Sequence, residues 1–180
     1  MKTRFEVVMA GSGGQGLIVS GIMLGEAAIL EGKNVAQTQS YGIATRGGFS
    51  KAEVIIDQEE IIFQQVEEPD IVLVLTGEAM EKFAQVKGTP VIYDTTLLAK
   101  RNETNFYGFP FTRLATELGR AAAANMIALG TISALTGIVQ TESLAEIARR
   151  RFSAQALELN LQALALGVNL IRKNAVREEL

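Results

Sequence analysis

The stretch FEVVMAGSGGQG, residues 5–16, does most to decide the fold of this chain. Its first six residues are an apolar run that stops at glycines, and residues 17–30 follow as a longer, largely apolar segment. Short apolar runs that end at glycines are typical of buried strands, whereas the longer segment has the length of a helix, with Gly32 as its C-cap. The stretch therefore predicts a strand, a glycine loop and a helix, which is how many α/β folds begin.

The same alternation continues downstream. Further strands are expected at residues 35–37, 52–56, 71–75, 91–93 and 105–109, and further helices at residues 78–85, 121–139 and 154–173. Residues 61–63 either continue the strand at 52–56 or begin a new element. This order predicts a three-layer α/β/α, Rossmann-like fold with a mostly parallel sheet, and 180 residues suit a single domain, residues 1–180. Because residues 40–56 leave no room for a crossover helix, at least one strand there is expected to be antiparallel.

Two C-terminal segments carry information beyond their length. Residues 121–139 contain no charged residue, but polar residues and glycines interrupt them, which favours a helix buried in protein over a membrane span. Two apolar stripes run along the last expected helix, one through Leu157 and Leu164 and the other through Ala156 and Ala163. Since an outer helix of a monomer needs only one stripe, this helix is either sandwiched in the fold or packed on a partner subunit.

Composition excludes several classes of chemistry. The chain has no histidine and no cysteine, so it holds no Ser-His-Asp triad, thiol nucleophile, disulfide or cysteine-ligated iron–sulfur cluster. Its net charge of −3 argues against binding to nucleic acid or to an anionic membrane. Because residues 1–4 lead directly into a strand with no signal-peptide pattern, we expect the protein to be cytoplasmic.

The glycine loop is the first candidate binding site. Gly11, Gly13 and Gly16 match the G-x-G-x-x-G pattern, which allows a tight turn and a close approach of the backbone to a phosphate at a helix N-terminus. Gly14 adds further freedom, and Gln15 offers an amide that both donates and accepts hydrogen bonds. The alternative is that these glycines only let the helix pack tightly on the sheet.

A dinucleotide site also requires an acidic residue after the second strand, to bind the ribose hydroxyls. Residues 38–41 hold no acid, and Glu31 precedes the strand, so the sequence argues against NAD or FAD binding. No lysine follows the glycines as in a P-loop.

A second glycine-rich loop follows the strand expected next to the first one. If the sheet is parallel there, both loops open at the same sheet edge, where ligand sites of α/β proteins form. Arg46 would hold a phosphate or carboxylate with its two-pronged guanidinium, or else lie in a solvated surface turn. The candidate cofactor-binding residues of this loop are Ser40, Tyr41, Gly42, Arg46, Gly47 and Gly48.

Taken together, the two loops resemble a known family. GSGGQG at residues 11–16, followed by QSYG-x-x-x-RGG-x-S at residues 39–50, is similar to the γ subunit of 2-oxoacid:ferredoxin oxidoreductases. The same module forms domain III of single-chain pyruvate:ferredoxin oxidoreductases. Residues 124–130 and 160–167 also look like this family, so the resemblance spans almost the whole chain. One departure is that Ile43 and Ala44 stand where many members have a Pro-Glu pair.

The resemblance implies a non-autonomous subunit of a complex that decarboxylates a 2-oxoacid, such as pyruvate, 2-oxoglutarate or 2-oxoisovalerate. Such a complex uses thiamine pyrophosphate, passes electrons through iron–sulfur clusters to ferredoxin, and delivers the acyl group to coenzyme A. The resemblance assigns thiamine pyrophosphate and magnesium to α and β subunits, and the clusters to the β or a δ subunit. Residues 11–16 and 40–48 would line the inter-subunit cleft near thiamine or coenzyme A, with no catalytic residue and no metal ligand in this chain.

Two other readings of the sequence remain. The chain is a free-standing Rossmann-type protein that binds NAD(P) or another nucleotide, or it is a structural oligomerising domain. Outside the glycine loops, Asp94 at a strand end is more typical of a helix cap than of a ligand contact. The arginine run at residues 149–151 is more typical of a solvated helix end than of a docking site for an acidic protein.

Overall fold

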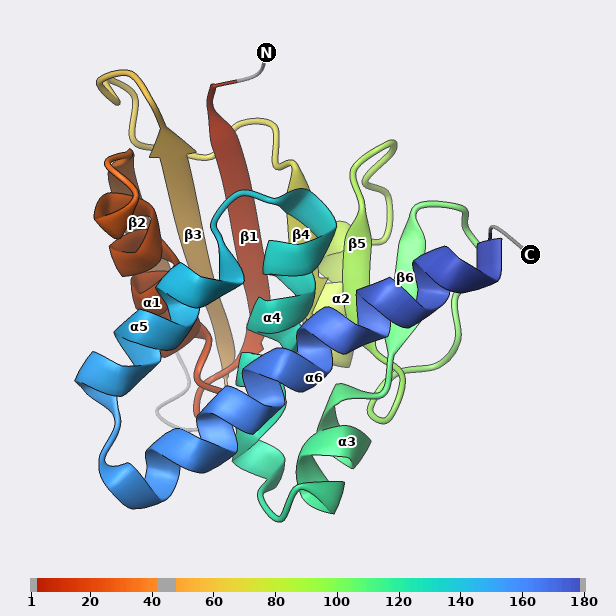
Figure 1. The fold of residues 1–180 in the computed structure, drawn as a ribbon. Coiled ribbons are helices and arrows are strands. Elements are labelled where there is room, and N and C mark those ends of the chain that lie inside the picture. The colour runs from red at the N-terminus through yellow and green to blue at the C-terminus, as the bar shows by residue number, and fades with distance from the viewer. Residues whose placement is uncertain (1–2, 42–47, 179–180) are drawn as a thin grey trace.

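The computed structural model describes residues 3–41 and 48–178, and these form one mixed sheet with helices on both faces (Figure 1). The sheet has six strands in the order β2-β3-β1-β4-β5-β6. β1, β4, β5 and β6 are mutually parallel, whereas β3 runs antiparallel to both of its neighbours, β1 and β2. The expected antiparallel strand is therefore confirmed. The strands are β1 (Phe5–Ser12), β2 (Asn34–Tyr41), β3 (Phe49–Asp57), β4 (Ile71–Val74), β5 (Val91–Asp94) and β6 (Phe106–Phe109).

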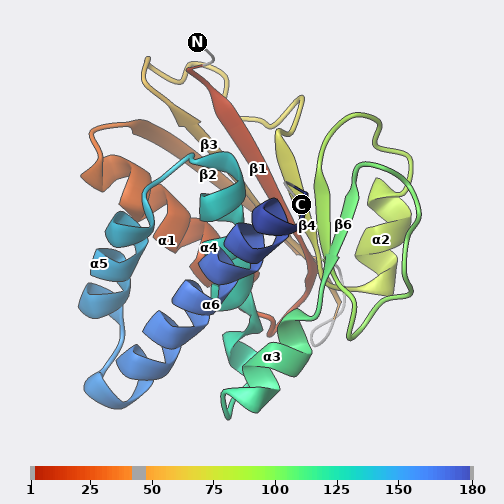
Figure 2. The same ribbon diagram turned by 45° about the vertical axis from the view of Figure 1, so that its right-hand side comes forward.

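The helices complete three layers, as expected from the sequence. Figure 2 shows α2 on one side of the sheet and α1, α4, α5 and α6 on the other. The helical elements are α1 (Leu17–Leu30), α2 (Gly77–Phe83), α3 (Phe111–Glu117), the 3₁₀ turn η1 (Ala121–Ala123), α4 (Ala124–Thr136), α5 (Thr141–Arg151) and α6 (Ala154–Glu178). The uncharged segment predicted as one helix is thus η1 followed by α4, and α4 ends where Gly137 adopts a φ of 63°.

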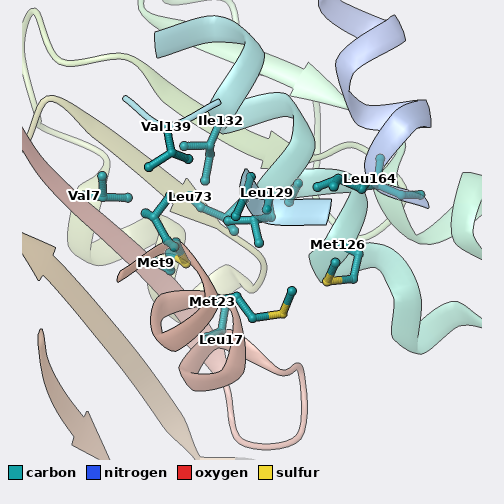
Figure 3. Close-up of a cluster of buried hydrophobic side chains, with 14 of the residues drawn as sticks. Val7, Met9, Leu17, Met23, Leu73, Met126, Leu129, Ile132, Val139 and Leu164 are labelled. Carbon is teal, nitrogen blue, oxygen red and sulfur yellow. The ribbon is translucent and has the colours of Figure 1, made fainter. Parts of the chain in front are cut away.

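Apolar side chains of the central strands are buried on both faces of the sheet. On the face that carries most helices, Val7, Met9 and Leu73 pack with Met23 of α1 and Leu129 of α4 (Figure 3). On the other face, residues such as Val8 and Val72 pack against α2. Two-sided burial explains why β1 and β4 are continuous apolar runs rather than alternating ones.

The helices α4 and α6 cross at two glycines, Gly130 and Gly167. A Cβ atom on Gly130 would lie 2.2 Å from the carbonyl oxygen of Leu164, and one on Gly167 would lie 2.0 Å from that of Ile127. Thr131 reinforces the crossing because its hydroxyl donates to the carbonyl oxygens of Ile127, at 2.9 Å, and Gly167, at 3.3 Å. Glycine is therefore required here because the two backbones touch.

Burial of α4 between the sheet and α6 confirms that the uncharged segment is a protein-buried helix. No helix in the described parts of the chain combines the length and the apolar character needed to cross a membrane.

Both apolar stripes of α6 face the chain's own core. Residues 163, 164, 167 and 168 form the buried centre of a single wide face, and the flanking leucines of both stripes pack against the same core. The opposite face, which includes Glu158, Gln162 and Asn169, is exposed. Intramolecular packing thus explains both stripes, and a partner subunit is not needed to account for the second one.

Three local expectations are wrong. β2 is not next to β1, because β3 lies between them. Ser40 and Tyr41 belong to β2 rather than to the following loop, and residues 61–63 form neither a strand nor a helix. α3 and α5, at residues 111–117 and 141–151, were not predicted as separate helices.

Candidate functional site

The first glycine loop and the described ends of the second meet at one edge of the sheet. Ser12, the last residue of β1, is opposite Phe49, the first residue of β3, and Tyr41 ends β2 beside Ser50. The backbone N–H of Gly13 donates to the carbonyl oxygen of Gly48 at 3.0 Å. The described ends of the two loops thus lie at one edge, and the antiparallel β3 brings them together. We call residues 11–16, 40, 41 and 48 the glycine edge.

Gln15 closes the first loop instead of pointing freely from its tip. Its Oε1 accepts a hydrogen bond from the backbone N–H of Ser12 at 2.8 Å, and its Nε2 donates to the carbonyl oxygen of Leu75 at 3.3 Å. The side chain therefore ties the end of β1 to the segment that follows β4. Gln15 shapes the loop, and both polar atoms of its amide already have a protein partner.

Two glycines of the loop lie directly under neighbouring polar side chains. A Cβ on Gly11 would lie 2.3 Å from Oε1 of Gln15, so this glycine makes room for the glutamine amide. Gly16 has a φ of 75°, and a Cβ there would lie 2.3 Å from Nδ2 of Asn125. Packing thus accounts for these two positions.

Gly13 and Gly14 are different, because both are exposed at the loop tip. Gly14 has a φ of 95°, and nothing lies within 4 Å of the position that its Cβ would occupy. Its positive φ satisfies the backbone turn, while the space over it stays open. These two glycines are the part of the loop that a ligand or a partner protein can approach closely.

The N-terminus of α1 opens at this edge without a compensating charge. Gly16 is the N-cap, no side chain caps the helix, and its first turn contains no acidic residue. A helix start leaves backbone N–H groups unpaired and carries the positive end of the helix dipole. Residues 11–16 are therefore suited to a phosphate or carboxylate, and this stretch contains no titratable side chain.

A cleft of about 290 Å³ continues from the loop between α1, the η1–α4 junction and α6. Its polar lining includes Arg120, Asn125 and Asn160, and its apolar lining includes Met126 and Leu159. Asn125 donates through Nδ2 to the carbonyl oxygen of Gly16 at 3.3 Å, which fixes the end of the glycine loop against α4. Sequence reasoning did not select these three polar residues, although Asn125 and Asn160 lie in the stretches that carry the family resemblance.

A larger cleft, about 480 Å³, lies between α1 and α5 and is lined by Ile29, Leu30, Ile147 and arginines of α5. No residue of the glycine edge lines it. Size alone therefore does not identify the candidate site.

The structure describes the second loop only at its two ends. Ser40 is exposed on β2 and stands opposite Lys51 of β3, so the register places it on the sheet face that α1 does not cover. Tyr41 ends β2, and Gly48 bonds to the first loop. The predicted site residues Gly42, Arg46 and Gly47 lie outside the described residues, as do Ile43 and Ala44.

Other polar features that stood out in the sequence have structural roles. Asp94 is fully buried and accepts from the N–H of Thr96 at 2.9 Å and from the N–H and hydroxyl of Thr112, so it has a structural role, holding the turn after β5 and the first turn of α3, and is not the N-cap of a helix that follows its strand. Hydrogen bonds from Arg4 and from two backbone N–H groups outweigh the effect of burial and lower the pKa of Glu6, at the opposite end of β1 from the glycine loop. Among the described residues, no cluster of three or more acidic side chains is placed to hold a metal ion.

A protein-family model described as pyruvate ferredoxin/flavodoxin oxidoreductase matches residues 6–170. The chain belongs to this family. The 2-oxoglutarate synthase subunit KorC of Archaeoglobus fulgidus is 41% identical over 176 residues, which cover 96% of this chain and 91% of the relative. The common γ subunit of the pyruvate/ketoisovalerate oxidoreductases of Pyrococcus furiosus is 31% identical over 88% of this chain and 92% of its own length.

Solved structures agree with this membership. The keto/oxoacid ferredoxin oxidoreductase γ subunit of Geobacter sulfurreducens superposes with a TM-score of 0.82 at 36% identity, covering 93% of this chain and 96% of that chain. A 2-oxoglutarate:ferredoxin oxidoreductase of Magnetococcus marinus, with 2-oxoglutarate, coenzyme A and succinyl-CoA bound, superposes with a TM-score of 0.86 at 25% identity. It covers 96% of this chain and 32% of the longer one.

These findings confirm the resemblance drawn from the paired glycine motifs. The chain is homologous to γ subunits of 2-oxoacid:ferredoxin oxidoreductases, which are multi-subunit oxidoreductases. The alternative of a free-standing NAD(P)-binding enzyme finds no support in them.

Proposed function

We propose that this chain is the γ-type subunit of a thiamine pyrophosphate-dependent 2-oxoacid:ferredoxin oxidoreductase. The complex would decarboxylate a 2-oxoacid, transfer the acyl group to coenzyme A and reduce ferredoxin. The observation that carries the proposal is the glycine edge, where exposed glycines and an uncapped helix N-terminus meet with no titratable side chain in the loop. Such a surface binds and positions a negatively charged group while other chains supply the reactive centre.

The proposed division of labour places thiamine pyrophosphate and magnesium in the α and β subunits and the iron–sulfur clusters in the β or a δ subunit. Ferredoxin would dock on the assembled complex. The sequence of this chain fits that division because it contains no cysteine to ligate a cluster.

The glycine edge would form one wall of the cleft between subunits. We propose that coenzyme A or the diphosphate of thiamine approaches main-chain N–H groups here, since both carry phosphates and the α1 N-terminus is uncompensated. The residues assigned to this wall are Gly11, Gly13, Gly14, Gln15, Gly16, Ser40, Tyr41, Gly42, Arg46, Gly47 and Gly48. Of these, Gly13 and Gly14 would make the closest approach, and Gln15 would hold the loop in shape.

We propose 2-oxoglutarate as the substrate of the complex. Four KorC subunits of 2-oxoglutarate synthases are 34–41% identical to this chain over 93–97% of its length. The γ subunits shared by pyruvate and ketoisovalerate enzymes are 31% identical, and two longer ketoisovalerate oxidoreductase VorA subunits are 32% and 34% identical. The test is to compare the reduction of a viologen dye by the assembled complex with 2-oxoglutarate, pyruvate and 2-oxoisovalerate. A higher kcat/KM for either of the other two acids would overturn this choice.

The function itself is tested by reconstitution. The chain would be purified alone, and the complex purified with and without it from the same host. We expect coenzyme A-dependent dye reduction from the complete complex only. Dye reduction by the isolated chain, or full activity of a complex that lacks it, would refute the proposal. The variant Gly14→Asn provides a sharper arm, because its side chain occupies the open space over the loop tip and asparagine tolerates a positive φ better than other residues, whereas Ile62→Val changes a 90% exposed side chain elsewhere.

A further inference from the structure

β2 forms one edge of the sheet and, within the described parts of the chain, pairs only with β3. It is eight residues long, so a long row of backbone N–H and C=O groups points away from the sheet. β6, at the other edge, has four residues and is followed directly by Pro110, which ends it. The β6 edge is therefore short and ended by a proline, whereas the β2 edge is long.

β2 also lacks the features that normally keep an edge strand from pairing. Natural edge strands are blunted by charged residues, proline, bulges or short length. The sequence NVAQTQSY contains no charge and no proline, and all eight residues pair in unbroken register with β3. Lys33, just before the strand, does not protect the edge, because its Nζ donates to Glu31 at 2.8 Å and to the carbonyl oxygen of Ile138 at 2.6 Å.

We propose that a second copy of this chain pairs with β2, antiparallel and across a twofold axis, so that the two sheets become continuous. The uncharged sequence of β2 favours a second copy as the partner, because when residues 34–41 pair with themselves no charge stands opposite a like charge. A twofold axis perpendicular to the sheet keeps each side chain on its own face and places one residue opposite its own copy. Near the centre of the strand that residue is Gln37 or Thr38.

The geometry leaves the first glycine loop open. In the register centred on Thr38, Tyr41 of each copy stands opposite Val35 of the other. The two ends of β2 that lead to the glycine loops are then separated by about 20 Å along the strands and point in opposite directions. Ser40 and Tyr41 would then pair with Ala36 and Val35 of the other copy, whereas residues 11–16 and 48 stay off this contact, so the inference does not depend on which partner subunits meet the first glycine loop.

The absence of cysteine from the chain makes a direct test possible. Residues opposed in an antiparallel pair have Cα atoms about 4.5–5.5 Å apart, which is within the span of a disulfide. In the full chain, either Gln37→Cys or Thr38→Cys is expected to form a covalent dimer under mild oxidation far faster than the control Ile62→Cys. Ile62 is 90% exposed and lies outside the sheet, so its rate measures random collisions.

Sedimentation equilibrium provides the second measurement. The unmodified chain and Ile62→Lys are expected to be dimers, whereas Thr38→Lys combined with Gln39→Lys is expected to be monomeric with an unchanged far-UV circular dichroism spectrum. If the lysine variant does not fold, the cysteine comparison still decides. A monomeric unmodified chain, cross-linking no faster than at position 62, or pairing of β2 with a partner subunit instead of a second copy would each overturn the proposal.

Discussion

The close crossing of α4 and α6 makes a quantitative prediction about Gly167. In Gly167→Ala the new Cβ would lie 2.0 Å from the carbonyl oxygen of Ile127 and 2.8 Å from the backbone nitrogen of Thr131. Carbon and oxygen atoms approach to about 3.3 Å even in the closest favourable contacts, so the helices must separate by about 1.3 Å. Both clashing atoms belong to backbone, and a side-chain rotation cannot relieve them.

Three contributions set the size of the effect. Overpacking of a well-packed core costs about 1–3 kcal/mol, and loss of the bond from Thr131 to the carbonyl oxygen of Gly167 adds about 1 kcal/mol. The higher helix propensity of alanine returns about 1 kcal/mol. We therefore expect Gly167→Ala to lower the free energy of unfolding by about 2 kcal/mol, which corresponds to a fall in Tm of about 4–8 °C for a chain of this size.

Thermal unfolding followed by circular dichroism measures this effect, with Gly77→Ala as a matched control. Gly77 begins α2 and has nothing within 4 Å of its Cβ position, so the same chemical change is expected to be neutral or slightly stabilising there. Gly130→Ala clashes at the same crossing, and one separation of the helices relieves both clashes. The double variant should therefore lose less than the sum of the two single losses. An unchanged Tm in Gly167→Ala, or strictly additive losses, would refute the reasoning.

Three further changes test other parts of the structure. Gln15→Ala leaves the N–H of Ser12 without its partner and should lower the free energy of unfolding by about 1–2 kcal/mol in urea titrations, while Gln15→Glu recovers only part of the loss. Asp94→Ala removes the acceptor for Thr112 at the start of α3 and should lower Tm by several degrees, about 1–3 kcal/mol, with an Asp94→Asn variant falling between the two. The pKa of Glu6 in the folded chain is lowered from 4.5, so its stabilising contribution is fully present above pH 4.5 and is lost as the pH falls through the lower folded pKa. Over that pH range, the urea midpoint of Glu6→Gln should therefore change less than that of the unmodified chain.

The unit from β1 to α1 was predictable because its determinants are local. An apolar run, glycines that permit the turn and a second apolar segment are all contiguous in the sequence, and the structure places the helix at Leu17–Leu30 as expected. The antiparallel strand was also predictable, since residues 40–56 leave no room for a crossover. The position of β3 between β2 and β1 was not, because it depends on long-range pairing of residues 49–57 with 5–12 that the spacing alone does not reveal.

The candidate site shows the same limit. Gln15 was selected correctly as a polar residue in the loop, but its role depends on the carbonyl oxygen of Leu75, 60 residues away in sequence. The cleft beyond Gly16 could not be predicted because its walls come from α1, the η1–α4 junction and α6, which only the tertiary structure brings together. In α6, the two stripes were interpreted as two faces, whereas their residues form one wide face centred on residues 163, 164, 167 and 168.

The arrangement of the glycine edge explains how a chain without histidine or cysteine can contribute to an oxidoreductase. The groups that it offers are backbone N–H groups, whose position depends on the conformation of residues 11–16 rather than on their side chains. Gln15 and Asn125 fix that conformation, one from within the loop and the other from α4, while Gly13 and Gly14 remain exposed. Substituting a fixing residue would therefore remove packing contacts and disturb the site together, whereas a side chain at Gly14 would meet no neighbouring atom and would act through the site and through local strain at its positive φ. This separation distinguishes a loop that serves a ligand or a partner from one that serves only the packing of α1.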